Sequence, residues 1–290
     1  MNSPIKDVSD TAYWIAHYRA QESERPDALF SDPLAASFAG DRGRKIAAAM
    51  PATRVVGWSV VLRTRIIDDY IAVAIDAGVD TVLNLGAGLD ARPYRMSLPA
   101  TLQWIEADYA RLLDYKERLS EGHALHCRLQ RVRIDLADRA ARLALLQRVN
   151  AQARKVLVIT EGVIPYLAND EVASLAEDLA AMAQLQFWVV DFFTELALKM
   201  RRRGRTGRSM QNAPFKFAPG DWFGFFRQYG WVVNRMRYYA DEAERLRRPI
   251  PLSPYLRLLY IASHLWLSPS QRRERRKFAG YALLERAVTS

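Results

Sequence analysis

The sequence predicts an α/β fold in which a mostly parallel sheet follows a helical N-terminal segment. Three observations lead to this prediction. Between residues 80 and 191, short apolar segments alternate with amphipathic ones, as expected for strands that are joined by helices. The first of these strands runs directly into a glycine-rich turn. Acidic residues follow four of the first five strands, at the sheet edge where such folds bind their ligands.

Residues 10–78 are predicted to form helices ahead of the first strand. The second helix is expected to begin near Pro33, where Ser31 or Asp32 can cap it. The third is expected to run from about residue 54 to residue 77, because its apolar residues recur with helical spacing. Many dinucleotide-binding domains open instead on their glycine motif, so this helical segment is a distinguishing feature.

Seven strands are predicted, and the last is expected to run antiparallel to its neighbours. Their approximate ranges are 81–85, 102–107, 132–134, 156–160, 187–190, 231–233 and 281–284. The arginine- and glycine-rich segment 199–212 is predicted to be a loop. We therefore expect a helical lid over residues 1–78 and a core over 79–290, with cap insertions at about 195–220 and 241–277.

The glycine-rich turn matches a nucleotide-binding pattern. Gly86, Gly88 and Ala91 satisfy G-x-G-x-x-G/A directly after a strand. About twenty residues later, Glu106 and Asp108 end the second strand, which is the spacing of a carboxylate that binds ribose. By itself the pattern also describes a dinucleotide site or an ordinary strand-to-helix turn.

The wider context narrows these interpretations. Leu-Gly-Ala-Gly-Leu-Asp-Ala-Arg-Pro-Tyr-Arg, residues 85–95, resembles the glycine motif of the leucine carboxyl methyltransferase family, a branch of the class I S-adenosylmethionine-dependent methyltransferases. Four other segments resemble the same family in the same order: 25–33, 62–65, 106–108 and 161–166. The resemblance covers about residues 10–240. It implies a Rossmann-like methyltransferase sheet and S-adenosylmethionine as the cofactor.

The resemblance also implies residues for each part of the cofactor. Arg63 would bind the methionine carboxylate, which suits a bidentate guanidinium; the alternative is a surface arginine on a helix. Gly86 and Gly88 would form the turn. Asp108 would bind the ribose hydroxyls, with Glu106 held in reserve because it points to the same face of the strand. Both acids have a structural alternative, as helix caps or surface groups.

Two segments are expected near the adenine and the reacting centre. Asp135 and Leu136 match an Asp-Leu pair that would contact adenine. Glu161 would face the cationic sulfonium and amino group, or else accept hydrogen bonds from backbone amides. Tyr166 would orient the acceptor oxygen, although a packing role is an equal alternative. Glu161 and Tyr166 are therefore the predicted catalytic residues.

Composition limits the other possibilities. The 290 residues contain one cysteine, Cys127, so an intrachain disulfide is excluded. No apolar run reaches the length of a membrane span and no signal-peptide pattern is present, so we expect a cytoplasmic protein. His123, His126 and Cys127 lack a fourth ligand at zinc spacing, so no metal is expected.

The net charge of +10 is concentrated in two segments of the chain. Two basic clusters, in 199–208 and 272–277, equal the whole excess of positive charge. No nucleic-acid motif or interleaved aromatic platform accompanies them, so a nucleic-acid partner is not expected. The apolar segment 255–267 and the basic cluster after it are interpreted as a cap over the pocket. The alternative is an interfacial contact of 255–277 with anionic lipid.

The sequence therefore predicts an O-methyltransferase that acts on a small molecule. A carboxylate is the preferred acceptor, because it is ionised at pH 7 and needs no general base; a phenol or enol is the second choice. Two other classes remain as alternatives. One is an NAD(P)-dependent oxidoreductase that uses the same turn, and the other is a nucleic-acid-binding or modifying protein that uses the basic clusters.

Overall fold

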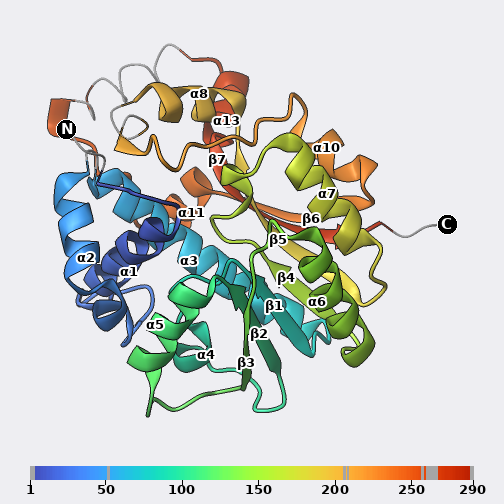
Figure 1. Ribbon diagram of the computed structural model, residues 1–290. Helices are drawn as coiled ribbons and strands as arrows, with labels where there is room; N and C mark the ends of the chain where they lie inside the picture. The colour runs from blue at the N-terminus through green and yellow to red at the C-terminus, as the bar shows by residue number, and fades with distance from the viewer. Residues whose placement is uncertain are drawn as a thin grey trace.

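The computed structural model describes residues 4–50, 53–204, 207, 209–255, 258 and 267–287. At its centre lies a seven-stranded sheet in the order β3-β2-β1-β4-β5-β7-β6 (Figure 1). The strands are β1 (Thr81–Leu85), β2 (Gln103–Asp108), β3 (Arg128–Arg133), β4 (Val156–Ile159), β5 (Leu185–Phe193), β6 (Trp231–Tyr238) and β7 (Ala279–Arg286). β7 pairs antiparallel with β5 and β6, and the other pairs are parallel. The predicted fold class is confirmed.

The strands that differ most in extent from the prediction are β3, β5 and β6. β3 begins at Arg128 rather than at 132, and its alternating exposure is that of an edge strand whose polar residues obscure the apolar pattern. β6, the other edge strand, continues to Tyr238 for the same reason. β5 extends to Phe193 because β7 pairs with it from Phe187 onward, a contact from far along the chain.

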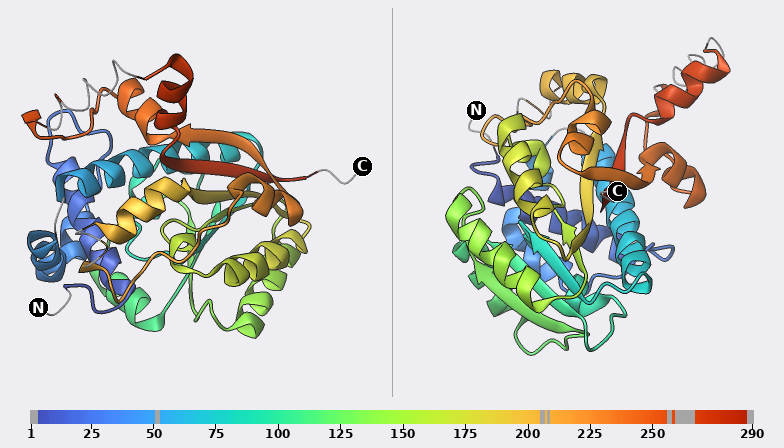
Figure 2. Two further views of the ribbon diagram at one scale, coloured as in Figure 1. Left: turned by 90° about the horizontal axis from the view of Figure 1, so that it is seen from above. Right: turned by 90° about the vertical axis from the view of Figure 1, so that its right-hand side faces the viewer.

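Helices cover both faces of the sheet (Figures 1 and 2). One face is covered by α6 (Arg139–Gln152), α7 (Asn169–Ala180) and α10 (Trp222–Gln228). The other is covered by α3 (Thr53–Asp76) and α11 (Tyr239–Arg245). The shorter or peripheral helices are α4 (Arg92–Arg95), α5 (Ala110–Ser120), η1 (Ile164–Tyr166), α8 (Glu195–Arg203) and α13 (Pro269–Arg276).

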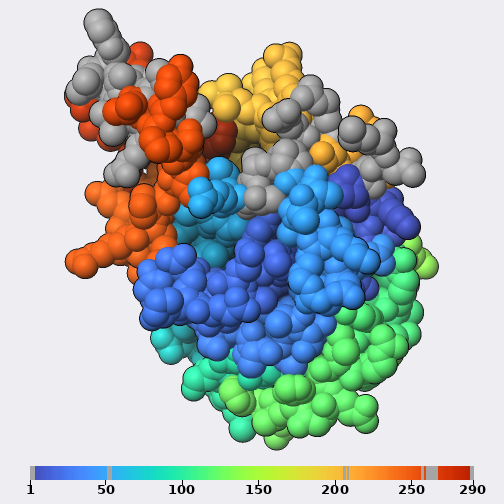
Figure 3. All heavy atoms as spheres, turned by 90° about the vertical axis from the view of Figure 1, so that its left-hand side faces the viewer, coloured from blue at the N-terminus to red at the C-terminus, as the bar shows by residue number. Residues whose placement is uncertain are grey.

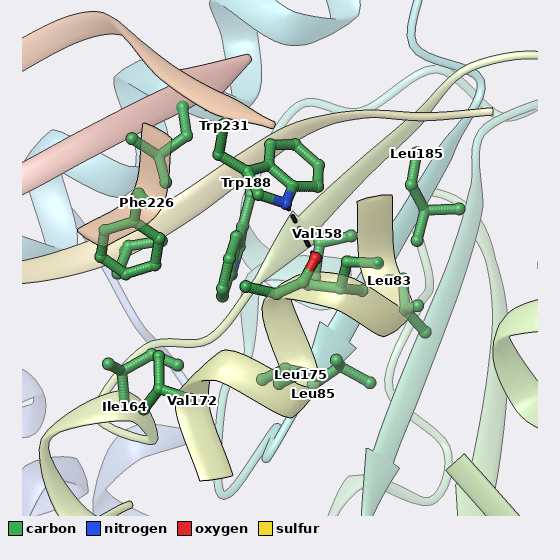
Figure 4. Close-up of a cluster of buried hydrophobic side chains, with 14 of the residues drawn as sticks. Leu83, Leu85, Val158, Ile164, Val172, Leu175, Leu185, Trp188, Phe226 and Trp231 are labelled. Atoms are coloured by element: carbon green, nitrogen blue, oxygen red, sulfur yellow. Dashed lines mark hydrogen bonds between the residues drawn. The ribbon is translucent and has the colours of Figure 1, made fainter. Parts of the chain in front are cut away.

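The first face has a core of large aromatic side chains (Figure 4). Trp188 on β5 and Trp231 on β6 are fully buried, with their rings 5.5 Å apart, and Phe226 of α10 packs against Trp188. Deep burial of such rings is a large source of stability. It anchors β5 three residues before Asp191, the acidic residue that the strand carries towards the sheet edge.

The N-terminal helices α1 (Ser9–Ser23) and α2 (Ala35–Ala49) pack against each other and cover one side of the molecule (Figure 3). The predicted cap of the second helix is wrong. Leu34 is the N-cap and no side chain caps it, while the Asp32 carboxylate binds Arg19 Nε at 2.8 Å. The buried Arg19 guanidinium therefore uses the carboxylate that was expected at the helix end.

The segment after β5 also differs from the prediction. Lys199–Arg203 belong to α8 rather than to a loop, and Thr194 caps this helix by accepting the Ala197 N–H. The predicted insertion 241–277 contains α11 and α13, and α13 projects from the body of the molecule (Figure 2). Most of the apolar segment 255–267 lies outside the described residues. Within the part of the chain that is described, no helix is both long and apolar enough to cross a membrane.

Candidate active site

A cavity of about 600 Å³ lies at the carboxyl edge of the parallel strands, below α1. Its size is typical of a small-molecule site. Polar groups converge here because parallel strands end together at this edge. The predicted site residues that line it are Arg63, Gly86, Gly88, Asp108, Asp135, Leu136, Glu161 and Tyr166.

The glycine turn after β1 requires its glycines. Gly86 has φ +69°, and a Cβ there would lie 2.4 Å from Val163 Cγ2. Gly88 has φ +50°, and its N–H donates to Asp108 Oδ2 at 2.7 Å. Asp108 Oδ1 accepts the Tyr109 N–H at 2.7 Å. Burial raises the pKa of the Asp108 carboxyl, while the two amides act in the opposite direction.

Glu106 lies outside this cavity. It is fully buried, and its two oxygens bind Lys116 Nζ at 2.6 Å and Arg131 Nε at 3.1 Å. Glu106 and Asp108 share a face of β2, as expected, but Glu106 lies one strand repeat further from the sheet edge. The structure therefore brings Asp108 to the cavity and pairs Glu106 with two cations.

Glu161 follows β4 and joins two arginines. Its Oε1 lies 2.8 Å from Arg63 Nε, and its Oε2 accepts from Arg92 Nη1 at 2.8 Å. Arg92 also binds Asp68 and Asp90, so the group is a network of buried charges. Burial alone would raise the pKa of Glu161, but Arg92 and Arg63 outweigh this effect and lower it. The carboxylate is thus held ionised by the protein itself.

Arg63 retains binding capacity towards the cavity. Its Nε is close to Glu161, but the N–H is not aligned for a hydrogen bond. A Cβ on Gly162 would lie 3.9 Å from Arg63 Nη1, so the guanidinium passes beside this glycine. Arg92 was not identified as a site residue from the sequence, although it lies within the glycine motif.

The segment after β3 forms another wall of the cavity. Leu136 and Ile134 contribute apolar surface, and Asp135 Oδ1 accepts the Ala137 N–H at 2.9 Å. The Leu136 carbonyl accepts from Arg142 Nη1 at 2.7 Å, which fixes this segment on α6. The wall combines an apolar surface with a carboxylate.

Tyr166 both packs and lines the cavity. Its ring meets Phe215 edge-on, with centroids 5.1 Å apart. Burial raises the pKa of the Tyr166 phenol, and Arg201 and Arg63 reduce that rise. Both interpretations of this residue from the sequence are therefore compatible with its position.

Asp191 and Arg201 are among the lining residues that had no role assigned from the sequence. Asp191 accepts hydrogen bonds from the Tyr281 hydroxyl and from the Gly162 N–H, the latter at 3.1 Å. Burial raises its pKa to about 6. The position of Asp191 after a strand indicated a ligand-side acid, but its partner Tyr281 lies ninety positions further along the chain.

Comparison with known proteins identifies similar chains. The sequence profile of the leucine carboxyl methyltransferase family matches residues 12–180. A candidate S-adenosyl-L-methionine-dependent methyltransferase of Frankia alni is 32% identical over 267 residues, covering 84% of this chain and 90% of that protein. One from Streptomyces avermitilis is 30% identical over 261 residues, covering 84% and 89%.

Solved structures share the fold at low sequence identity. A candidate methyltransferase from Thermobifida fusca superposes with a TM-score of 0.56 at 14% identity and covers 94% of each chain. A protein from Streptomyces avermitilis also gives 0.56, at 12% identity, covering 94% of this chain and 97% of that one.

Proposed function

Since this chain belongs to the leucine carboxyl methyltransferase family and is an S-adenosylmethionine-dependent methyltransferase, we propose that it methylates an oxygen atom of a small molecule. A carboxylate is the preferred acceptor and a phenol or enol is the second choice. The proposal includes a cytoplasmic location, as expected from the sequence, and an acceptor from secondary metabolism.

The residues that line the cavity fit the chemistry of the cofactor. S-Adenosylmethionine supplies an electrophilic methyl group on a positively charged sulfur. Arg63 presents a partly free guanidinium that suits a carboxylate, and Asp108 presents a carboxylate that suits ribose hydroxyls. Leu136 offers apolar surface for adenine, and Glu161, which is ionised and paired with Arg63 and Arg92, would be the carboxylate that faces the cationic group.

The single observation that carries the choice of a carboxylate is the state of Asp191. This acid lines the cavity, but each of its oxygens already accepts one hydrogen bond, so a phenol would have to compete with the Tyr281 hydroxyl and the Gly162 N–H for the same carboxylate. A phenol with a pKa near 10 requires a base, whereas a carboxylate is ionised at pH 7. The work left to the protein is then alignment and exclusion of water, for which α1 supplies Trp14 and Ile15 as part of the cavity wall.

A phenol remains the second candidate because Asp191 titrates in a suitable range. With a pKa of about 6, it is mostly ionised at neutral pH and retains lone pairs that accept no hydrogen bond. With a phenol acceptor, kcat/KM should rise with pH through about 6 and lose that rise in Asp191→Asn. With a carboxylate acceptor, the rate should stay level between pH 6 and pH 8.

Neither alternative class is favoured. The relatives are methyltransferases, and Arg201 of the first basic cluster points into the cavity rather than to an outer face. In the second cluster, Arg276 binds Asp241 and Glu244, and Lys277 binds Glu274. These pairs reduce the positive charge that is available to a nucleic acid.

Calorimetric titration with S-adenosylhomocysteine, with NADH in parallel, tests the cofactor. We expect binding of the first compound alone. Labelled S-adenosylmethionine offered with a library of organic acids and phenols then tests the acceptor. Methyl esters release volatile methanol in mild base and methyl ethers do not, so the two acceptor classes separate. Binding of NADH alone, or label found only on nitrogen, carbon or sulfur, would contradict the proposal.

A further inference from the structure

Arg201 is a cavity-lining arginine that forms no ion pair with any residue that the structure describes. It lies on α8, and its guanidinium enters the cavity on the side of Tyr166. Its Nε is buried, and within the described residues the guanidinium makes no hydrogen bond or ion pair. Burial lowers the pKa of Arg201, which is the expected effect of placing a cation away from water.

The other described arginines of the cavity wall all have carboxylate partners. Arg19 binds Asp32, Arg63 binds Glu161, and Arg139 and Arg142 both bind Asp178. Asp191 is close enough to influence Arg201 electrostatically but forms no ion pair with it. Because a partly buried cation without a partner is costly, the contrast indicates that a ligand supplies the anion.

The surroundings of Arg201 hold it in place. Its guanidinium carbon lies 4.6 Å from the ring centre of Phe215 and 5.6 Å from that of Phe193. The next residue, Arg202, donates to the Phe215 carbonyl at 2.8 Å and to the Lys216 carbonyl at 3.0 Å, which fixes this segment against α8. Arg201 is therefore positioned by aromatic contacts, and its guanidinium has no hydrogen-bond partner among the described residues.

We propose that Arg201 binds an anionic group of the methyl acceptor, while Phe215 and Phe193 contact its flat apolar part. The acceptor is then an organic acid with an aromatic or similarly planar body. This inference rests on the proposed function, because it assigns the Tyr166 side of the cavity to the acceptor. A guanidinium is suited to such a group, since it forms paired charge-assisted hydrogen bonds with a carboxylate.

The test uses the full chain saturated with S-adenosylhomocysteine. The probes are phenylacetate, cinnamate and 2-naphthoate, each compared by calorimetry with its uncharged amide. The wild type should bind at least one acid about tenfold or more tightly than the amide, as expected for a hydrogen bond between charged groups. Arg201→Met should remove this preference. Arg203→Met is the matched control, because it removes the same charge from an exposed position on the same helix.

Thermal unfolding without ligand separates a binding role from a structural one. If the role of Arg201 is to bind an anionic group of the ligand, Arg201→Met should leave the melting temperature of the ligand-free protein unchanged or raise it. A purely structural arginine would lower it. The inference is overturned if no acid is preferred over its amide by the wild type, or if Arg201→Met keeps the preference.

The two proposals fail separately. If S-adenosylhomocysteine binds and methyl esters or ethers form, but the preference for acids does not depend on Arg201, only this inference fails. If the preference depends on Arg201 but no O-methyl product forms, the proposed function fails, and the anion site remains.

Discussion

The two halves of the cavity differ in whether their charged side chains are paired. In the half that we propose for the cofactor (the cofactor half), at the ends of β1, β2 and β4, Glu161 is paired with Arg63 and Arg92, and Asp108 is bound by two backbone amides. In the half that we propose for the acceptor (the acceptor half), beside β5 and α8, Arg201 has no ion-pair partner among the described residues, and Asp191 is a buried acid bound only by neutral donors.

This difference indicates how each half binds its ligand. A network that satisfies its own charges is preorganised, so the ligand meets groups that are already fixed. A half that leaves charge unpaired is less stable by itself and gains more when a complementary ligand arrives. Substitutions in the cofactor half should therefore lower stability and cofactor affinity together. Substitutions in the acceptor half should change stability and ligand affinity independently of each other.

The largest effect is expected from Glu161→Gln. Removal of this charge leaves Arg63 and Arg92 without one carboxylate partner each. The free energy of unfolding should fall by about 3 kcal/mol or more, as expected when one partner of a buried ion pair is lost. Urea denaturation gives the stability and calorimetry gives the affinity for S-adenosylhomocysteine, which should fall at least about tenfold.

The matched control for this change is Glu177→Gln, which removes the same charge from an exposed position on α7. It should leave both quantities within experimental error. If Glu161→Gln keeps full stability and full affinity for S-adenosylhomocysteine, the ion-pair network does not preorganise the cofactor half for binding.

A smaller effect is expected from Gly86→Ala. A Cβ would lie 2.4 Å from Val163 Cγ2, and φ of +69° disfavours alanine, so we expect a loss of about 2–3 kcal/mol with weaker binding of S-adenosylhomocysteine. The double variant Gly86→Ala with Val163→Ala should regain the part of the lost stability that comes from the contact with the Val163 side chain. Gly220→Ala, where nothing lies within 4 Å of the new Cβ, is the control. Additive effects of the two substitutions would rule out the contact as the cause.

The smallest effect belongs to the acceptor half and depends on pH. The folded pKa of Asp191 is raised to about 6 from 3.8, so its contribution to stability is full below pH 3.8 and is lost as the pH rises through 6. Between pH 5 and pH 7.5 this loss is about 1.4 kcal/mol. Asp191→Asn should therefore gain stability relative to the wild type by that amount over this range. Urea denaturation of both proteins at pH 5 and pH 7.5 measures this gain. A difference in stability between them that is equal at the two pH values would contradict the raised pKa of Asp191.

Local sequence was sufficient to identify several residues that line the proposed cofactor half of the cavity. The turn that contains Gly86, the strand end that contains Asp108 and the Glu161 segment were found because each is a short motif next to a buried strand. Motifs of this kind depend on neighbouring residues, so their positions at one sheet edge follow from the parallel topology.

The acceptor half was not predictable in the same way. Asp191 depends on Tyr281 from an antiparallel strand at the other end of the chain, and Arg201 depends on Phe215 from the following segment. Neither relation has a spacing or a periodicity that sequence alone reveals. The edge strands β3 and β6 were underestimated for a related reason, since their one-sided burial is decided by which neighbours cover them.

The sequence by itself determined the alternation of strands and helices, the glycine turn and the residues next to it, because these depend on local backbone preferences and apolar periodicity. Only the tertiary structure decided which acids have partners. It pairs Glu106 with Lys116 and Arg131, places Asp108 at the cavity and pairs Glu161 with Arg92. Among the described residues, it gives Arg201 no ion-pair partner. The physical reason is that the state of a charge is set by desolvation and by its nearest opposite charge, and both are properties of packing between distant segments.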